Sequence, residues 1–167
     1  MKIYIGPYND DLDSEVEREI KIELDPYDTW NLDHTLSLII HPLLVQLKET
    51  KQGSPYVDDE DVPENLRSTA AAPKENEWDT DSCHHDRWDW VMDEMIWAFG
   101  QDADDEELFQ HNVDNLKMTM DGGKVTFGIE DPTKPEYFYD KEGHKAHEAR
   151  KSNGRRLFAK YYPALWD

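Results

Sequence analysis

Apolar and polar residues alternate in three short stretches of the chain. Residues 2–5 (KIYI) and 18–24 (REIKIEL) place their isoleucines on one face of an extended strand. Residues 117–129 repeat the alternation on either side of Asp-Gly-Gly, a sequence that favours a tight hairpin turn. The pattern therefore predicts two N-terminal strands and a separate hairpin.

Three longer stretches follow the period of a helix. Residues 32–50 are apolar almost all round the helical axis, which predicts a central, buried helix. Residues 83–99 form a second helix, and residues 141–162 form a third, in which a break is expected at Asn153-Gly154. We therefore expect an α+β fold, with about three main helices packed on a small antiparallel sheet made by the N-terminal strands and the hairpin.

The stretch from about residue 51 to 82 has no periodicity, contains three prolines before residue 80 and is rich in acids. Loops of this length inside a compact domain are usually functional or disordered. The segments 8–14 and 101–112 are also predicted to be loops, the second with one helical turn. A chain of 167 residues is long enough for one domain and short for two, so residues 1–167 are predicted to be a single domain.

The charge of the chain is high and unevenly distributed. It contains 38 acidic and 18 basic residues, which gives a net charge of −20. Residues 1–114 hold 30 of the acids and only 8 of the bases, whereas residues 115–167 hold 8 acids and 10 bases. Such an acidic region repels nucleic acid and attracts basic proteins or divalent cations. Simple solubility, or adaptation to a salty habitat, explains the same composition.

The helix at 83–99 is expected to make two apolar contacts. One face is predicted to enter the core and carries Trp88, Val91, Met92, Met95 and Phe99. The opposite face combines an acidic stripe with two tryptophans, and consists of Asp86, Asp89, Asp93, Trp90 and Trp97. Tryptophans on a polar face need a cover. We expect that cover to be the long loop, through Trp78 and Tyr56, the C-terminal tail or a partner.

The acidic stripe is also the strongest candidate for metal chemistry. Carboxylates spaced along one helix face can share Mg²⁺ or Mn²⁺, and the acids Asp58, Asp59 and Asp61 of the loop are the only rich second cluster. A metal-dependent nucleotide hydrolase is therefore an alternative, but a solvated acidic face without a cofactor is favoured. The adjacent Cys83, His84 and His85 are poorly spaced for zinc. No catalytic residue is identified.

The C-terminal helix is basic and is followed by aromatic residues. A phosphorylated ligand is one candidate partner, because cations beside aromatic rings suit phosphate binding and base stacking. The residues predicted to contact phosphate are Lys151, Arg155, Arg156 and Lys160. The favoured alternative is internal: this helix docks against the acidic helix at 83–99.

No apolar run is long enough to span a bilayer, and the N-terminus lacks the apolar segment of a signal peptide. Cys83 is the only cysteine, so no disulfide can form within the chain. These features predict a soluble cytosolic protein.

Several blocks resemble an uncharacterised family of tailed bacteriophages of the marine and myovirus type. They are MKIYIGPY, DPYDTWNLDHTLSLIIHPLLVQLKETKQGSPYVDDEDVP, LRSTAAAPKENEWDTD, RWDWVMDEMIWAF and GRRLFAKYYPALWD. The resemblance implies a viral, non-virion protein in the host cytoplasm and carries over no catalytic residue. It favours a non-enzymatic protein for host takeover or counter-defence, which binds a host protein or a nucleotide-type ligand. A homo-oligomer, a particle component and a replication accessory remain alternatives.

Overall fold

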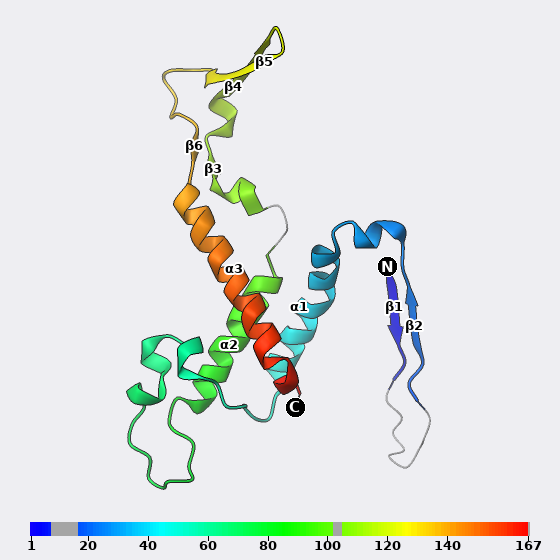
Figure 1. The fold of residues 1–167 in the computed structure, drawn as a ribbon, viewed down its shortest axis with the longest axis vertical. Helices are drawn as coiled ribbons and strands as arrows, with labels where there is room; N and C mark the ends of the chain where they lie inside the picture. Colours follow the sequence, from blue (N-terminus) through cyan, green and yellow to red (C-terminus); the bar gives the residue numbers. More distant parts are fainter. Residues whose placement is uncertain (8–16, 102–104, 167) are drawn as a thin grey trace. The chain divides into compact units, whose positions relative to one another are not determined.

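The computed structural model describes residues 1–7, 17–101 and 105–166, which belong to two compact units. Unit 1 comprises residues 1–39 and unit 2 comprises residues 40–167 (Figure 1). The boundary falls within helix α1 (Leu32–Thr50), so each unit contains one half of it. The predicted loop at 8–14 and residues 102–104 lie outside the described residues. The expectation of one domain stays a prediction.

Unit 1 is built on an antiparallel pair of strands, β1 (Lys2–Ile5) and β2 (Ile20–Glu23). Ile3 lies opposite Ile22 and Ile5 opposite Ile20, so the four isoleucines share one face. A 3₁₀ turn at Pro26–Thr29 then leads into α1, and Asp25 caps this turn through its side chain. The alternation in the sequence therefore predicted both strands correctly.

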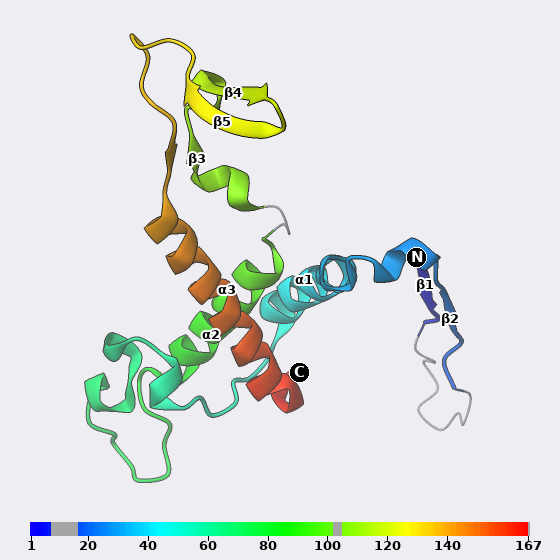
Figure 2. The same cartoon turned by 45° about the horizontal axis from the view of Figure 1, so that its top comes forward.

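Unit 2 has its core between α2 (His84–Phe99) and α3 (Lys141–Tyr161), which pack against each other and cross in Figures 1 and 2. The predicted core face of α2 is confirmed, since Val91, Met92 and Met95 are fully buried and Trp88 is 2% exposed. Phe99 is half-buried and packs edge-on against Phe158 of α3, with 4.9 Å between ring centroids.

Helix α3 continues without a break through Gly154, contrary to the prediction. Gly154 is buried where the two helices meet, and a Cβ atom there would lie 2.4 Å from Ala98 Cβ and 2.5 Å from the carbonyl oxygen of Glu94. The glycine therefore allows a close approach of α3 to α2. The sequence Asn-Gly has the composition of a helix end, but packing against α2 outweighs that local preference.

The prediction that α1 is the central, buried helix is wrong. Leu44 is its only buried residue, while Leu38 and Leu43 are 65% and 64% exposed. Leu44 joins the core and Ile40 and Leu47 pack beside it. One helix can turn only one stripe toward a core formed by two others, so the apolar residues on the remaining faces of α1 stay in contact with solvent.

The long loop of unit 2 is irregular but packed. It forms three short 3₁₀ turns at Asp59–Asp61, Glu64–Leu66 and Ser68–Ala70, and it places Val57 and Val62 in the core. Tyr56 and Trp78 are instead 83% and 82% exposed. The prediction that these two rings fold over the tryptophans of α2 is therefore wrong.

The remaining strands of unit 2 form two small sheets. Strands β4 (Leu116–Asp121) and β5 (Lys124–Ile129) make the predicted hairpin (Figure 2). Its turn residues Gly122 and Gly123 both have positive φ, 54° and 82°, as a two-residue hairpin turn requires. The short strands β3 (Gln110–His111) and β6 (Phe138–Tyr139) pair with each other. In the sequence, β3 precedes the hairpin and β6 follows it.

The base of the β4–β5 hairpin is held by a buried asparagine. Asn115 is 1% exposed; its side-chain oxygen accepts from the Asp131 amide at 2.8 Å, and its side-chain nitrogen donates to the Pro135 carbonyl at 2.9 Å. A buried amide with these partners fixes the chain where it leaves β5.

The α+β class is confirmed by three helices with small antiparallel sheets. In the described part of the chain the strands form three separate two-stranded sheets, β1–β2, β3–β6 and β4–β5. The N-terminal strands and the hairpin were expected to contribute to one sheet, but they do not pair with each other. Hydrophobic alternation specifies which face of a strand is apolar, and it does not specify which strand lies alongside.

Candidate functional site: paired charges and uncovered apolar faces

The acidic loop and the basic helix α3 meet in one ionic cluster around Asp61. The Asp61 side chain is 1% exposed and accepts a hydrogen bond from the Tyr161 hydroxyl at 2.7 Å. It also forms ion pairs with Arg156 at 2.7 Å and with Lys160 at 2.6 Å. We call these four residues, with Asp58 and Glu60, the Asp61 cluster. A buried carboxylate with three donors is internally satisfied.

The electrostatics of the Asp61 cluster favour its charged form. Burial opposes ionisation of Asp61, but hydrogen bonds from Lys160, Tyr161 and Arg156 outweigh burial and lower its pKa. Hydrogen bonds to Asp58 and Asp61 raise the pKa of Lys160. Burial, followed by the hydrogen bond to Asp61, raises the pKa of Tyr161 to about 12. The cluster therefore stabilises the fold with Asp61 ionised and Lys160 protonated.

Two further acids of the predicted loop surface also have partners within the protein. Asp58 pairs with Lys160 at 2.7 Å, and Asp59 accepts hydrogen bonds from the amide and the hydroxyl of Ser68. Asp58 and Asp61 of the predicted acidic surface are thus paired with Lys160 of the predicted phosphate surface, and Asp61 is also paired with Arg156. These internal pairs involve part of each predicted surface, and both surfaces stay predictions.

Of the other two predicted phosphate contacts, one is buried and paired within the chain and the other is exposed. Lys151 is 4% exposed and pairs with Glu148 at 3.0 Å, so its ammonium is not presented to a ligand. Arg155 is exposed. The favoured internal reading of the basic helix is confirmed by Arg150, whose guanidinium contacts Glu94 of α2 through both Nε and Nη2, at 3.0 Å and 2.7 Å. Sequence analysis had assigned no partner to Glu94 or Arg150.

The acidic stripe of α2 is also partly neutralised. Asp89 pairs with Lys51 at 2.9 Å, and Asp93 pairs with Lys48, so the end of α1 and the start of the loop supply cations to this face. Asp86 is exposed. The stripe was expected to be solvated along its whole length, and two of its three acids instead link α2 to the segment that precedes it.

Trp90 and Trp97 of α2 are both half-buried, and helix α3 covers one of them. The edge of the His147 ring lies over Trp97 with 5.0 Å between centroids, and the Arg150 guanidinium lies 4.0 Å from the centre of the same indole. Trp90 packs beside the core. Trp97 therefore contributes to the contact between α2 and α3.

One group of carboxylates has the spacing of a metal site. Oxygens of Asp58, Glu60 and Asp61 lie within 4.8 Å of one another. The Lys160 ammonium contacts all three of them, at 2.7, 3.2 and 2.6 Å. A side-chain cation of the protein already occupies the centre of this group, so it is a poor candidate for holding Mg²⁺ or Mn²⁺.

The histidine and cysteine candidates have structural partners. His84 is buried and its Nε2 lies 3.1 Å from the Ser54 carbonyl, while His85 Nδ1 lies 3.0 Å from the Ser54 hydroxyl. His144 bonds to the hydroxyl of Tyr139. Cys83 is half-buried at the start of α2. These contacts anchor the loop and α3 and do not assemble a nucleophile with a base.

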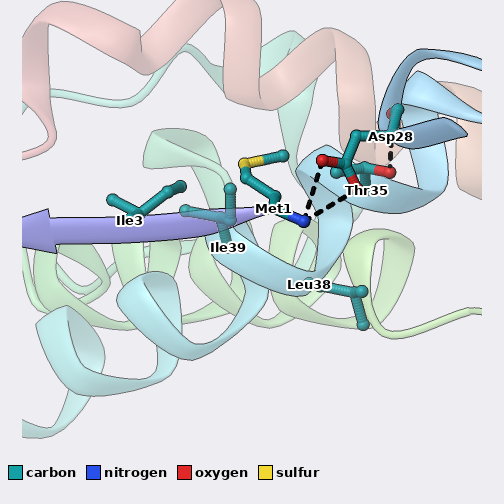
Figure 3. Close-up of a pocket in the computed structure, with 6 residues that line it drawn as sticks. All are labelled: Met1, Ile3, Asp28, Thr35, Leu38 and Ile39. Carbon is teal, nitrogen blue, oxygen red and sulfur yellow. Dashed lines mark hydrogen bonds and ion pairs between the residues drawn. The ribbon is translucent and has the colours of Figure 1, made fainter. Parts of the chain in front are cut away.

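Unit 1 contains a cavity of about 320 Å³ beside β1 (Figure 3). The lining combines apolar side chains from residues 1–3 and from α1 with one polar residue of the 3₁₀ turn and one of α1; the residues are Met1, Ile3, Asp28, Thr35, Leu38 and Ile39. The N-terminal ammonium contacts both oxygens of Asp28, at 2.9 and 2.8 Å, and this hydrogen bond lowers the pKa of the Asp28 carboxyl. The Thr35 hydroxyl donates to the Asp28 carbonyl at 2.9 Å.

The strand face that continues from this cavity is apolar and exposed. We call it the unit 1 apolar face; it comprises Ile3, Ile5, Ile20 and Ile22, which are 41%, 52%, 63% and 57% exposed. Leu24 and Trp30 of the same unit are 64% and 84% exposed. Among the described residues of unit 1, only Gly6 is buried. Sequence periodicity identified this apolar face.

The β4–β5 hairpin repeats this arrangement in unit 2. One of its faces carries only apolar residues, which we call the hairpin face: Leu116, Met118, Met120, Val125, Phe127 and Ile129. Met118, Met120 and Phe127 are 62%, 71% and 67% exposed. The opposite face is polar, and Thr119 and Thr126 lie within hydrogen-bond distance across it, at 3.1 Å.

No protein-family model, curated protein or solved structure matches this chain. Within the described ranges, none of the helices combines the length and the apolar character needed to cross a membrane.

Proposed function

We propose that this chain is a non-enzymatic binding protein whose unit 1 docks onto a basic protein. The observation that carries the proposal is the unit 1 apolar face, four isoleucines that are each at least 41% exposed. The resemblance to tailed-phage proteins suggests that the chain is phage-encoded and that the partner is a protein of the infected host.

The first argument is the missing core of unit 1. An isolated two-stranded hairpin is at best marginally stable in water, and contiguous exposed apolar surface usually marks an interaction site. The described part of unit 1 buries none of its apolar side chains, and Ile20 and Trp30 are among the most exposed of them. A partner that covered this face would supply the apolar contact that the unit does not make within itself.

The second argument is charge, which indicates the chemistry of the partner. Residues 1–39 contain ten acidic and three basic residues. Two of the cations are already paired along the strands, Lys2 with Glu23 and Lys21 with Glu19. The apolar face therefore belongs to an acidic unit, which favours a partner with a basic rim around an apolar centre. Opposite charges across such a contact increase the association rate and the specificity.

The hydrolase alternative has less support. A metal-dependent mechanism needs carboxylates that are free to hold the ion, but Asp89 and Asp93 pair with lysines, and Lys160 occupies the centre of the loop carboxylates. We therefore do not propose catalysis.

The test compares matched variants of the full chain. Ile5→Thr combined with Ile22→Thr keeps β-branched residues in both strands but removes apolar surface from the unit 1 apolar face. Tyr4→Thr makes a similar change on the opposite face of β1. The probe is a peptide of alternating lysine and leucine, and binding is measured by fluorescence anisotropy at low and high NaCl.

We expect the wild type and Tyr4→Thr to bind the peptide, and the double isoleucine variant to lose at least tenfold in affinity. Binding should weaken as NaCl rises, because exposed charges are screened. Equal binding by all three proteins, or no binding by the wild type, would overturn the proposal. The same variants, used to capture proteins from a lysate of infected cells, would then identify the natural partner.

A further inference from the structure

We infer that the hairpin face of β4–β5 is a contact between two copies of this chain. The inference is independent of the proposed function, because it concerns unit 2 and a different kind of partner. Its basis is the register of the hairpin, in which each apolar residue of one strand lies opposite an apolar residue of the other: Leu116 with Ile129, Met118 with Phe127, and Met120 with Val125.

The hairpin face needs a cover for the same physical reason as unit 1. Five of its six side chains are at least 41% exposed, and two strands alone do not make a stable sheet in water. Its local structure is nevertheless well specified, by the glycine turn at one end and the buried Asn115 at the other. The face is thus preorganised as a surface, which lowers the cost of ordering it when a partner binds.

The charge of the hairpin face indicates a different partner from the basic protein proposed for unit 1. Residues 116–129 contain two lysines and one aspartate, and all three point to the polar side, where Asp121 lies opposite Lys124. The hairpin face itself carries no ionisable side chain. It offers no charge that would attract a basic partner, and two copies of this acidic chain that meet through it bring no ionisable side chain of the face itself together.

The face is also suited to two-fold symmetry. The Met118–Phe127 pair is central in the register, with one apolar pair on either side. A two-fold axis through the central pair places Met120 and Val125 of one copy against Leu116 and Ile129 of the other. Two hairpins joined in this way form a small sandwich whose inner layer is apolar, and the flexible methionine side chains can adjust to fill it.

The primary test is the mass of the full chain in solution, measured by sedimentation over a wide range of concentration and NaCl. We expect a dimer that becomes tighter as NaCl rises, because salt screens the repulsion between two acidic chains and leaves apolar contact intact. The partner contact of unit 1 should respond to salt in the opposite direction, so the failure of one proposal is distinguishable from the failure of the other.

Met118→Thr combined with Phe127→Thr should give a monomer with unchanged helical circular dichroism. Ile5→Thr combined with Ile22→Thr, an equivalent loss of apolar surface in unit 1, should remain dimeric. A wild type that is monomeric under all conditions, or a dimer that survives Met118→Thr with Phe127→Thr, would overturn the inference.

A second measurement does not depend on the folding of that double variant. In a Cys83→Ser background, Met118→Cys places a thiol near the proposed axis, and Thr119→Cys places one on the opposite face. With an added oxidant, we expect at least tenfold more covalent dimer from Met118→Cys. Equal yields from the two variants would contradict a contact through the hairpin face.

Discussion

The α2–α3 contact and the β4–β5 hairpin belong to the same unit, but apolar side chains are buried in the first and exposed in the second. In the first, Met92 and Met95 are completely buried, and Glu94 between them is paired with Arg150. In the second, Met118 and Met120 are 62% and 71% exposed on a face without any charge. The methionine side chain is identical in the two places, so the difference lies in what surrounds it.

The comparison separates stability from interaction. The contact between α2 and α3, the loop and the Asp61 cluster buries its apolar side chains and pairs many of its charged groups within the chain, so it has little left for a partner. The unit 1 apolar face and the hairpin face instead carry uncovered apolar side chains. Mutations in the helical contact should therefore affect unfolding, while mutations on these two faces should affect binding.

The largest effect on stability is expected from truncating a buried methionine. Met95→Ala should lower the free energy of unfolding by about 3 kcal/mol, because it removes apolar contacts and leaves a cavity. Met118→Ala, at 62% exposure, should change it by less than about 0.5 kcal/mol when the protein is dilute enough to be monomeric. Urea denaturation followed by circular dichroism measures both. Equal losses would remove the distinction between the two regions.

A smaller effect is expected where the two helices approach each other. Gly154→Ala should cost about 2 kcal/mol, since the new Cβ overlaps Ala98 and the Glu94 carbonyl, and the better helix propensity of alanine recovers only about 1 kcal/mol. Gly128→Ala is the matched control, because nothing lies within 4 Å of its Cβ position. A neutral Gly154→Ala variant would show that the helices are not in close contact.

Substitution of Asp61 tests whether the ion pairs of the Asp61 cluster contribute to stability. Asp61→Asn should cost about 1.5 kcal/mol, because Arg156 and Lys160 lose a buried anion but remain partly solvated. Asp86→Asn removes an exposed carboxylate and should cost less than about 0.5 kcal/mol. If the two variants were equally stable, the cluster would be only a surface arrangement.

The smallest expected effect is a loss of folding stability at acid pH. The pKa of Asp61 is lower in the folded chain than its ordinary value of 3.8, so ionised Asp61 favours folding above that value, and this contribution is lost as pH falls through the folded pKa. Between about pH 5 and about pH 3, the wild type should lose more stability than Asp61→Asn, by under 1 kcal/mol. Parallel pH profiles of thermal unfolding for the two proteins would contradict this linkage.

The sequence by itself determined the local elements. Alternating isoleucines specified β1 and β2, the Asp-Gly-Gly turn specified the β4–β5 hairpin, and helical periodicity specified α1 at Leu32–Thr50 and the core face of α2. Each of these properties is decided by neighbours within a few residues, through backbone geometry and the side on which apolar side chains fall. The α+β class followed from the list of elements alone.

Only the tertiary structure decided which apolar face is covered and which charge meets which. Hydrophobicity predicted a buried α1, yet α2 holds the central place. A break was predicted at Asn153-Gly154, but α3 continues there because Gly154 packs against α2. The acids of the loop and the cations of α3 were read as separate binding sites, although Asp61 and Lys160, 99 positions apart in the sequence, form one ion pair at 2.6 Å. Local periodicity records that a face is apolar or charged, but the identity of its partner depends on contacts between distant parts of the chain.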